Sequence, residues 1–189
     1  MFDVEIKRSE WKQKITGELS GRLVFLDESS VNIDLTRRYG RSLSGKRVVD
    51  HTPLNTPQIT TILSSVRLNG EKAFTVYSGG TTSTCFLDYL DNVLIPTLHS
   101  GDIIVMDNMR SHHIKEVAKH LEKHKLIPCY LPPYSPDLNP IEKMWSKMKA
   151  ILRKWKIRSA DQLKAAVKNA LCLISDDDVA HWFKHCLYF

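Results

Sequence analysis

The segment from Leu131 to Trp155 constrains the fold more than any other part of the chain, because it combines a turn, a helix start and an amphipathic helix. Its proline-rich beginning would end a strand. Asn139 fits an N-cap, and Pro140 fits the first helical position, where a missing N–H costs nothing. Apolar residues then recur at helical spacing, which predicts one buried stripe. The stripe consists of Ile141, Met144, Trp145, Met148, Ile151, Leu152 and Trp155.

Glu142 lies in the first turn of this predicted helix, beside the stripe, and has two interpretations. Asn139-x-x-Glu142 has the spacing of a capping box, and a glutamate near a helix N-terminus interacts favourably with the helix dipole. In the other interpretation the carboxylate is a functional acid, and the preceding part of the chain favours this one.

Two short apolar runs that end on an aspartate predict strands buried on both faces. They are residues 22–27 and residues 102–107. Asn69-Gly70 separates two further strand-like runs and predicts a hairpin with a type I′ turn. A fifth strand over residues 126–131 contains Pro128, which places it towards a sheet edge.

The remaining pattern predicts helices. Helical spacing over residues 83–98 predicts one helix, which Pro96 bends or ends. An apolar stripe from Ile114 to Leu121 predicts a second helix. Ser159 and Ser175 begin two short C-terminal helices. Early strands joined without helices should be antiparallel, and later strands that alternate with helices should be parallel. We therefore predict an α/β fold, a mixed five-stranded sheet flanked by helices on both faces.

The chain carries a net charge of +6 and has a pI of about 9.1, which favours a polyanionic partner. The positive residues cluster in two places, and each cluster is either a solvated surface or a set of phosphate contacts. The loop from Thr36 to Val49 contains Arg37, Arg38, Arg41, Lys46 and Arg47. The predicted helix that follows Asn139 contains Lys143, Lys147, Lys149, Arg153 and Lys154.

Other site types receive less support. The four cysteines are scattered without a CxxC pair, which is typical of free thiols in a reducing compartment. No apolar run approaches the roughly 18 residues of a membrane span, and the N-terminus lacks the apolar region of a signal peptide. His181 and His185, with Cys186, have metal-ligand spacing, but no second thiol pair accompanies them, so we do not predict zinc there.

Three acids could form one site. Asp27 and Asp107 each end a predicted buried strand, and parallel strands would bring both to the sheet edge where ligands of α/β folds bind. Glu142 could reach the same edge. Three convergent carboxylates without a base need a hard divalent cation, Mg²⁺ or Mn²⁺. Two such ions about 4 Å apart would suit phosphodiester cleavage. Taken singly, Asp27 could cap a turn and Asp107 could cap a helix.

Three motifs carry a resemblance to a known family. They are Phe25-Leu-Asp-Glu-Ser29, Val105-Met-Asp-Asn108 with His112, and Tyr134-Ser-Pro-Asp-Leu-Asn-Pro-Ile-Glu142 followed by Trp145. Over roughly residues 20–155 the chain resembles the catalytic domain of bacterial insertion-sequence transposases of the mariner-like superfamily, and the 34 residues between Asp107 and Glu142 are the spacing of that group. The last motif is highly specific.

The resemblance implies a ribonuclease H-like fold and a DDE triad in which Asp27, Asp107 and Glu142 bind two Mg²⁺ or Mn²⁺ ions. Asn108 and His112 would support the metals. The implied partners are DNA, as element ends and target, and a second copy of the chain in a homodimer. The expected domains are a lead-in segment over residues 1–21, the catalytic domain over 22–158, and helices packed on it over 159–189.

One departure from the family concerns the helix-turn-helix modules that precede the catalytic domain in full-length members. The first acid of the triad is already at position 27, so such modules are expected on a separate polypeptide, unless the chain is a truncated copy or an excised piece. We expect a cytoplasmic protein associated with the nucleoid and not with a membrane. Two rival functions are a ribonuclease H-type nuclease acting on RNA–DNA hybrids and a catalytically idle, DNA-binding remnant of a transposase. The proline-rich motif argues against the former and the intact triad against the latter.

Overall fold

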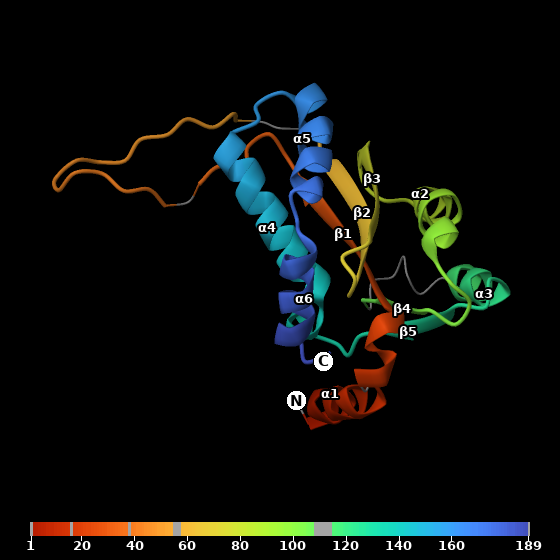
Figure 1. Ribbon diagram of the computed structural model, residues 1–189. Helices are drawn as coiled ribbons and strands as arrows, with labels where there is room; N and C mark the ends of the chain where they lie inside the picture. The colour runs from red at the N-terminus through yellow and green to blue at the C-terminus, as the bar shows by residue number, and fades with distance from the viewer. Residues whose placement is uncertain (1, 16, 38, 55–57, 108–114, 189) are drawn as a thin grey trace.

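The computed structural model describes residues 2–15, 17–37, 39–54, 58–107 and 115–188 (Figure 1). Its strands are β1 (Leu23–Val31), β2 (Thr60–Arg67), β3 (Lys72–Ser78), β4 (Ile103–Met106) and β5 (Ile127–Tyr130). Its α-helices are α1 (Phe2–Lys14), α2 (Ser83–Tyr89), α3 (Lys115–Lys123), α4 (Pro140–Trp155), α5 (Ala160–Cys172) and α6 (Asp176–His185). Short helical turns are η1 (Gly17–Arg22), the π-helical η2 (Leu90–Leu94), η3 (Ile95–Thr97) and η4 (Pro136–Leu138).

The five strands form one mixed sheet in the order β3-β2-β1-β4-β5. β1 pairs antiparallel with β2, and β2 with β3, whereas β4 pairs parallel with both β1 and β5. This topology confirms the predicted strand directions and the edge position of the strand that contains Pro128. The central strand β1 therefore joins the antiparallel half of the sheet to the parallel half.

Helices cover both faces of the sheet (Figure 1). On one face, Phe25 packs in a core with residues of α1, α4, α5 and α6, and its ring lies 5.4 Å from the ring of Phe183 between centroids. On the other face, Leu26 packs with residues of α2, η2 and α3, including Tyr89 and Leu121. Because adjacent strand residues point to opposite faces, the continuous apolar run of β1 is needed to fill both cores.

The hairpin forms at the predicted place, but the prediction of a type I′ turn is wrong. Gly70 has a φ of 87°, whereas Asn69 is not among the residues with positive φ. The Gly70 N–H donates to the Arg67 carbonyl at 2.9 Å, and the Arg67 N–H donates to the Glu71 carbonyl at 3.1 Å. This is the pattern of a three-residue loop with glycine in the left-handed position. Leu68 belongs to the loop and packs against the core.

Two helix predictions need smaller corrections. The helix predicted over residues 83–98 is α-helical only to Tyr89 and continues as η2 and η3, with Pro96 inside η3. The stripe of α4 is buried as far as Leu152 except for Ile151, which is partly buried, and Trp155 is 38% exposed, since the last turn of α4 extends beyond the core. Ser175 forms the predicted kind of N-terminal cap with Asp178, whereas Ser159 makes no side-chain cap bond.

Helix α1 lies within the N-terminal segment and packs on the core. Trp11 of α1 is buried, and its indole N–H donates to the Tyr188 hydroxyl at 3.1 Å. The Arg8 guanidinium donates to Ser135 Oγ at 2.7 Å and to Asp137 Oδ1 at 2.9 Å. Helix α1 therefore supports the turn that leads into α4.

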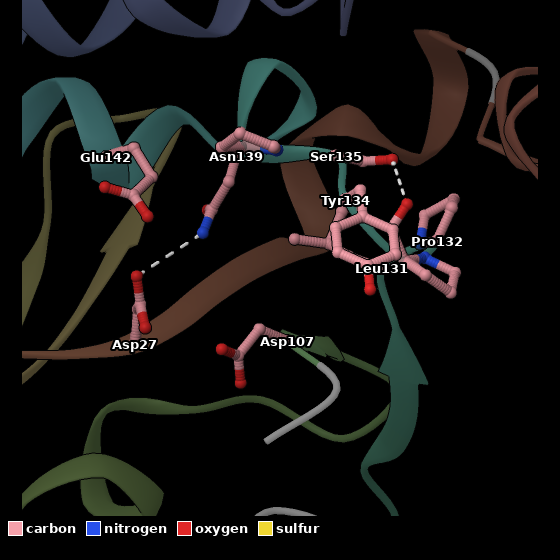
Figure 2. Close-up of a pocket in the computed structure, with 10 residues that line it drawn as sticks. Asp27, Asp107, Leu131, Pro132, Tyr134, Ser135, Asn139 and Glu142 are labelled. Carbon is pink, nitrogen blue, oxygen red and sulfur yellow. Dashed lines mark hydrogen bonds between the residues drawn. The ribbon is translucent and has the colours of Figure 1, made fainter. Parts of the chain in front are cut away.

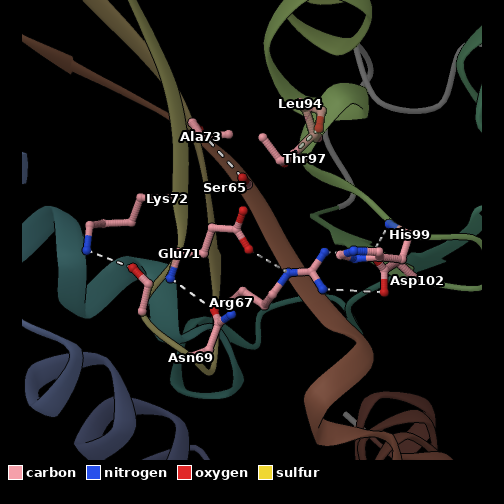
Figure 3. Close-up of polar contacts among 11 residues, drawn as sticks. Ser65, Arg67, Asn69, Glu71, Lys72, Ala73, Leu94, Thr97, His99 and Asp102 are labelled. Atoms are coloured by element: carbon pink, nitrogen blue, oxygen red, sulfur yellow. Dashed lines mark hydrogen bonds and ion pairs between the residues drawn. The ribbon is translucent and has the colours of Figure 1, made fainter.

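A buried ion pair joins the antiparallel hairpin to β4 (Figure 3). The Arg67 guanidinium at the end of β2 lies 2.6 Å from Asp102 Oδ2, and the His99 backbone N–H donates to the same oxygen at 2.7 Å. The sequence predicts only that Asp102 begins an apolar run. Its partners explain why a charged residue can precede β4 at a buried position.

Between β1 and β2 the chain makes a long excursion away from the body of the molecule (Figure 1). Its described residues from 39 to 51 are exposed and form no helix or strand. The base of the excursion is held by Arg158, which donates to the carbonyls of Ile33 and Leu35, and by an ion pair between Lys156 and Asp50 at 2.8 Å. Among the described helices, none has the length and apolar character that a membrane span requires.

Candidate active site

The sheet register brings Asp27 and Asp107 to the same level. Phe25 of β1 pairs with Val105 of β4, and each aspartate lies two residues further along the chain, Asp27 within β1 and Asp107 directly after β4. Side chains two residues apart share a face, so both acids lie on the face that α4 covers. The prediction that Asp27 ends its strand is wrong, because β1 continues to Val31 through its pairing with β2. β4, however, stops at Met106, which opens the sheet edge beside Asp27.

Glu142 comes to the same place from the first turn of α4. Figure 2 shows the carboxyl groups of Asp27, Asp107 and Glu142 facing a common space. That space is a pocket of about 270 Å³, which all three acids line together with Asn139, Tyr134 and Leu131. The structure therefore brings together the three acids that the sequence singled out.

The capping-box interpretation of Glu142 is wrong. Asn139 does occupy the N-cap position of α4, but its side chain makes no capping hydrogen bond. Its amide nitrogen instead lies 3.5 Å from Asp27 Oδ2, as a weak donor towards that carboxylate (Figure 2). The side chain that would have closed the capping box is thus directed to the acid pocket.

Asp27 is the buried member of the three acids, with 5% of its surface exposed. Its pKa is raised to about 7, mainly by burial and also by the negative charges of Glu142 and Asp107. The hydrogen bond from the Glu28 backbone N–H, at 2.7 Å, and that from the Trp145 indole N–H, at 3.2 Å, oppose this rise in pKa. Asp27 therefore loses its proton at a cost that a cation in the pocket would offset.

Trp145 has a role that the sequence analysis missed. We expected only a core residue, and it is indeed buried in the stripe of α4. Its indole N–H also holds Asp27 Oδ2 in place. A buried indole N–H requires an acceptor, which was a usable signal, although the identity of the acceptor depends on the tertiary fold.

This environment predicts a pH dependence of stability in the metal-free protein. The pKa of Asp27 is about 7 in the folded state against 3.8 for an unperturbed aspartate. A raised folded-state pKa contributes stability that is complete below the unfolded pKa and is lost as pH rises through the folded one. Between pH 5 and pH 8, with EDTA present, we expect Asp27 to lower the free energy of unfolding by about 2–3 kcal/mol.

Urea denaturation of wild type and Asp27→Asn at both pH values tests this expectation. The difference between the two pH profiles isolates Asp27 from other titrating groups, because those groups are shared. Parallel profiles for the two proteins would show that Asp27 does not carry the raised pKa.

The predicted basic residues separate into groups. Arg37, Arg41, Lys46 and Arg47 are exposed in the excursion, Lys154 is exposed on α4, and Lys143 is half-buried there. Arg37 and Arg153 line one pocket of about 540 Å³, which brings the excursion and α4 together. Lys147 instead forms an ion pair with Asp178 of α6. Arg38, Asn108 and His112 lie outside the described residues.

Lys149 of α4 interacts electrostatically with two acids of the pocket, Glu142 and Asp27. It is half-buried, and burial lowers the pKa of its ammonium group. The negative charges of Glu142 and Asp27 act in the opposite direction. Lys149 and Arg153 also line a common pocket, so positive charge continues from the acids along α4.

The comparisons with known proteins agree with this geometry. The DDE superfamily endonuclease family matches residues 22–164. Among curated proteins no sequence matches the chain. A Mos1 transposase paired-end complex with the left transposon end is 20% identical with a TM-score of 0.75, over 96% of this chain and 56% of that one. The catalytic domain of Mos1 mariner transposase is 17% identical with a TM-score of 0.65, over 96% of this chain and 83% of that one.

These likenesses confirm the predicted ribonuclease H-like fold class. The chain spans little more than half the length of the transposase in the paired-end complex and most of the isolated catalytic domain. Mos1 paired-end complexes also match in forms that contain Mn or Mg.

Proposed function

The chain belongs to the DDE superfamily endonucleases, and from this we propose that it is the catalytic domain of a mariner-like DNA transposase. It would cleave DNA strands and join the resulting 3′-hydroxyl ends to a target. The observation that carries the proposal is the pocket in which Asp27, Asp107 and Glu142 meet at the edge of β1 and β4. The likeness to Mos1 complexes with DNA supports it.

The donor set of this pocket fits Mg²⁺ or Mn²⁺. All three acids offer carboxylate oxygens, the ligands that hard cations prefer. Among the described residues, Asn139 Oδ1 is buried without a hydrogen-bond partner, so a further oxygen beside Asp27 is available. Two bound ions would supply an activated water or 3′-hydroxyl and stabilise the leaving oxygen of the phosphodiester.

The residues of the chain would position these participants. Trp145 and Asn139 orient Asp27, and the rigid helix α4 carries Glu142. Tyr134 lines the same pocket, is 90% exposed and has a φ of 56°. A tyrosine held in this uncommon backbone conformation at the pocket mouth would stack on a base next to the cleaved phosphate.

The DNA backbone would follow the basic residues that lead away from the pocket. Lys149 lies within the electrostatic reach of Asp27 and Glu142, Arg153 is one turn further along α4, and Arg37 shares a pocket with Arg153. These side chains would contact phosphates, which position a protein without reading sequence. A separate helix-turn-helix polypeptide and a second copy of the chain remain the proposed partners for recognition of the element ends.

Salt titration of DNA binding tests this surface. We expect log K to fall with log salt with a slope of roughly −4 to −8, and Arg37→Gln/Arg153→Gln to make the slope shallower by about 2. A control, Lys119→Gln/Lys123→Gln on α3, removes the same charge from the opposite face of the sheet and should leave the slope nearly unchanged. Equal effects of the two double variants would mean that net charge alone, and not this surface, attracts DNA.

Strand cleavage tests the function itself. In Mn²⁺ or Mg²⁺ the purified chain should nick supercoiled DNA, with an end-binding partner added if needed, and should leave an RNA–DNA hybrid intact. Cleavage of the RNA strand in the hybrid would instead favour a ribonuclease H-type nuclease. Binding without any cleavage, with the partner and metal present, would favour an idle remnant.

A further inference from the structure

A second cluster of metal-binding side chains lies away from the acid pocket. The ligand atoms of Asp91, His120 and His124 all lie within 4.8 Å of one another. Asp91 belongs to η2, His120 belongs to α3, and His124 lies in the turn directly after the last residue of α3. The Nε2 atom of His120 contacts the Asp91 carboxylate, and the rings of His120 and His124 lie 5.2 Å apart between centroids.

Local and tertiary structure each contribute to this cluster. His120 and His124 are four residues apart, so they project from the same side of α3 and its end. Val117 and Leu121 of α3 pack in the same core as Leu90 and Leu94 of η2, which fixes the two segments beside each other. Asp91 and His124 are exposed and His120 is half-buried, so the three side chains form a rim above that core that solvent ions can reach.

We propose that Asp91, His120 and His124 form a binding site for a borderline transition metal ion, with Zn²⁺ as the best fit. Two imidazole nitrogens and one carboxylate oxygen form a common zinc donor set with one coordination position open. Zinc–ligand distances near 2.1 Å place tetrahedral ligand atoms roughly 3.4 Å apart. From within 4.8 Å of one another, partly exposed side chains reach this spacing by small rotations.

The site would differ from the acid pocket in the ion that it selects. Imidazole ligands suit Zn²⁺, Ni²⁺ and Cu²⁺, whereas Mg²⁺ prefers oxygen ligands alone. The ion would join α3 to η2 and thereby stabilise the helix layer opposite α4. Helix α3 is the first described helix after β4 and Asp107, so this cross-link would act on the face of the sheet that the catalytic acids do not occupy.

His181, His185 and Cys186, which have metal-ligand spacing in the sequence, do not form a comparable metal-binding cluster in the described structure. Cys186 is buried, whereas both histidines are exposed, and His181 Nδ1 lies 2.8 Å from the Asp177 carbonyl oxygen. The double variant His181→Gln/His185→Gln is therefore a matched control that removes two exposed histidines from a helix without touching the proposed site.

Zinc titration of untagged, EDTA-stripped protein tests the proposal, with a thiol-free reductant to keep cysteines reduced and excess Mg²⁺ to occupy the acid pocket. Competition with a chromophoric zinc chelator gives the affinity and stoichiometry. We expect one strong site per chain, and His124→Gln and Asp91→Asn should each lower its affinity about tenfold or more, because each removes one ligand. The control variant should bind as wild type does.

Cobalt provides a second readout that does not depend on stability. Bound Co²⁺ should give the intense visible absorption of a tetrahedral site in wild type and in the control, and this band should weaken in His124→Gln, whose circular dichroism should match wild type. The proposal would be overturned by any of three results. These are no zinc binding in wild type, unchanged binding in both His124→Gln and Asp91→Asn, and loss of binding in the control variant. None of these outcomes depends on DNA cleavage, so the site can fail while the proposed function stands.

Discussion

Glu142→Gln is expected to abolish strand cleavage and leave the fold of α4 unchanged. The substitution replaces a carboxylate in the acid pocket with a neutral amide of the same shape. Loss of a residue that only supports a metal ligand typically costs roughly 10- to 100-fold, so loss of a direct ligand should cost at least about 100-fold. The structure gives no reason for the helix to unravel, since the Asn139 side chain makes no capping bond at this N-terminus.

The measurement is the rate of metal-dependent nicking of supercoiled DNA, with melting followed by circular dichroism. Glu122→Gln on α3 is the matched control, because it makes the same chemical change at an exposed position on the other face of the sheet. Full activity in Glu142→Gln would remove Glu142 from the catalytic site and leave it a local role in α4.

The second large effect concerns metal and stability. Clustered carboxylates repel one another, and an ion bound only by the folded state stabilises it by mass action. At a hundred times the dissociation constant this stabilisation is about 2.7 kcal/mol, which for a chain of this size raises the melting temperature by roughly 5–10 °C. Asp107→Asn should remove most of this rise at equal Mn²⁺ concentration.

The metal-free Asp107→Asn protein should be as stable as wild type or more stable, because its substitution removes a negative charge that raises the pKa of Asp27. Asp161→Asn, at an exposed position of α5, serves as the control and should keep the full response to metal. If Asp107→Asn unfolds the domain and wild type shows no response to Mn²⁺, then Asp107 is a structural residue.

The strands could be predicted because their sequences report burial directly. Continuous apolar runs identified β1 and β4, and the order of elements gave the antiparallel and parallel pairings. The end of β1 could not be predicted, since its extension to Val31 depends on pairing with β2 and not on hydrophobicity. The hairpin turn failed for a similar reason. Asn69-Gly70 fits either loop length, and the choice depends on the pairing register of Val66 with Lys72.

The acids of the candidate site could be predicted, but the groups that hold them could not. Asn139 was correctly placed at the start of α4, yet its side chain turns to Asp27, a residue distant in sequence. Trp145 combines burial with a hydrogen bond to the same carboxylate. Local patterns assign such residues to caps or cores, because they contain no information about which distant group completes their hydrogen bonds.

The same limit applies to the second metal cluster. His120 and His124 have helical ligand spacing, but so do His181 and His185. The packing of η2 against α3 brings the Asp91 carboxylate to His120 and His124. Sequence spacing alone does not distinguish this pair from His181 and His185. Spacing within a helix therefore identifies half of a metal site, and tertiary contacts decide whether it is completed.

Anomalous diffraction from crystals soaked in Mn²⁺ can show whether Asp27, Asp107 and Glu142 bind divalent cations. We expect two anomalous peaks about 4 Å apart in the pocket between the three carboxylates, and their loss in crystals of Asp107→Asn. If saturating Mn²⁺ produces no peak within coordination distance of these carboxylates, they are not the metal ligands that we propose.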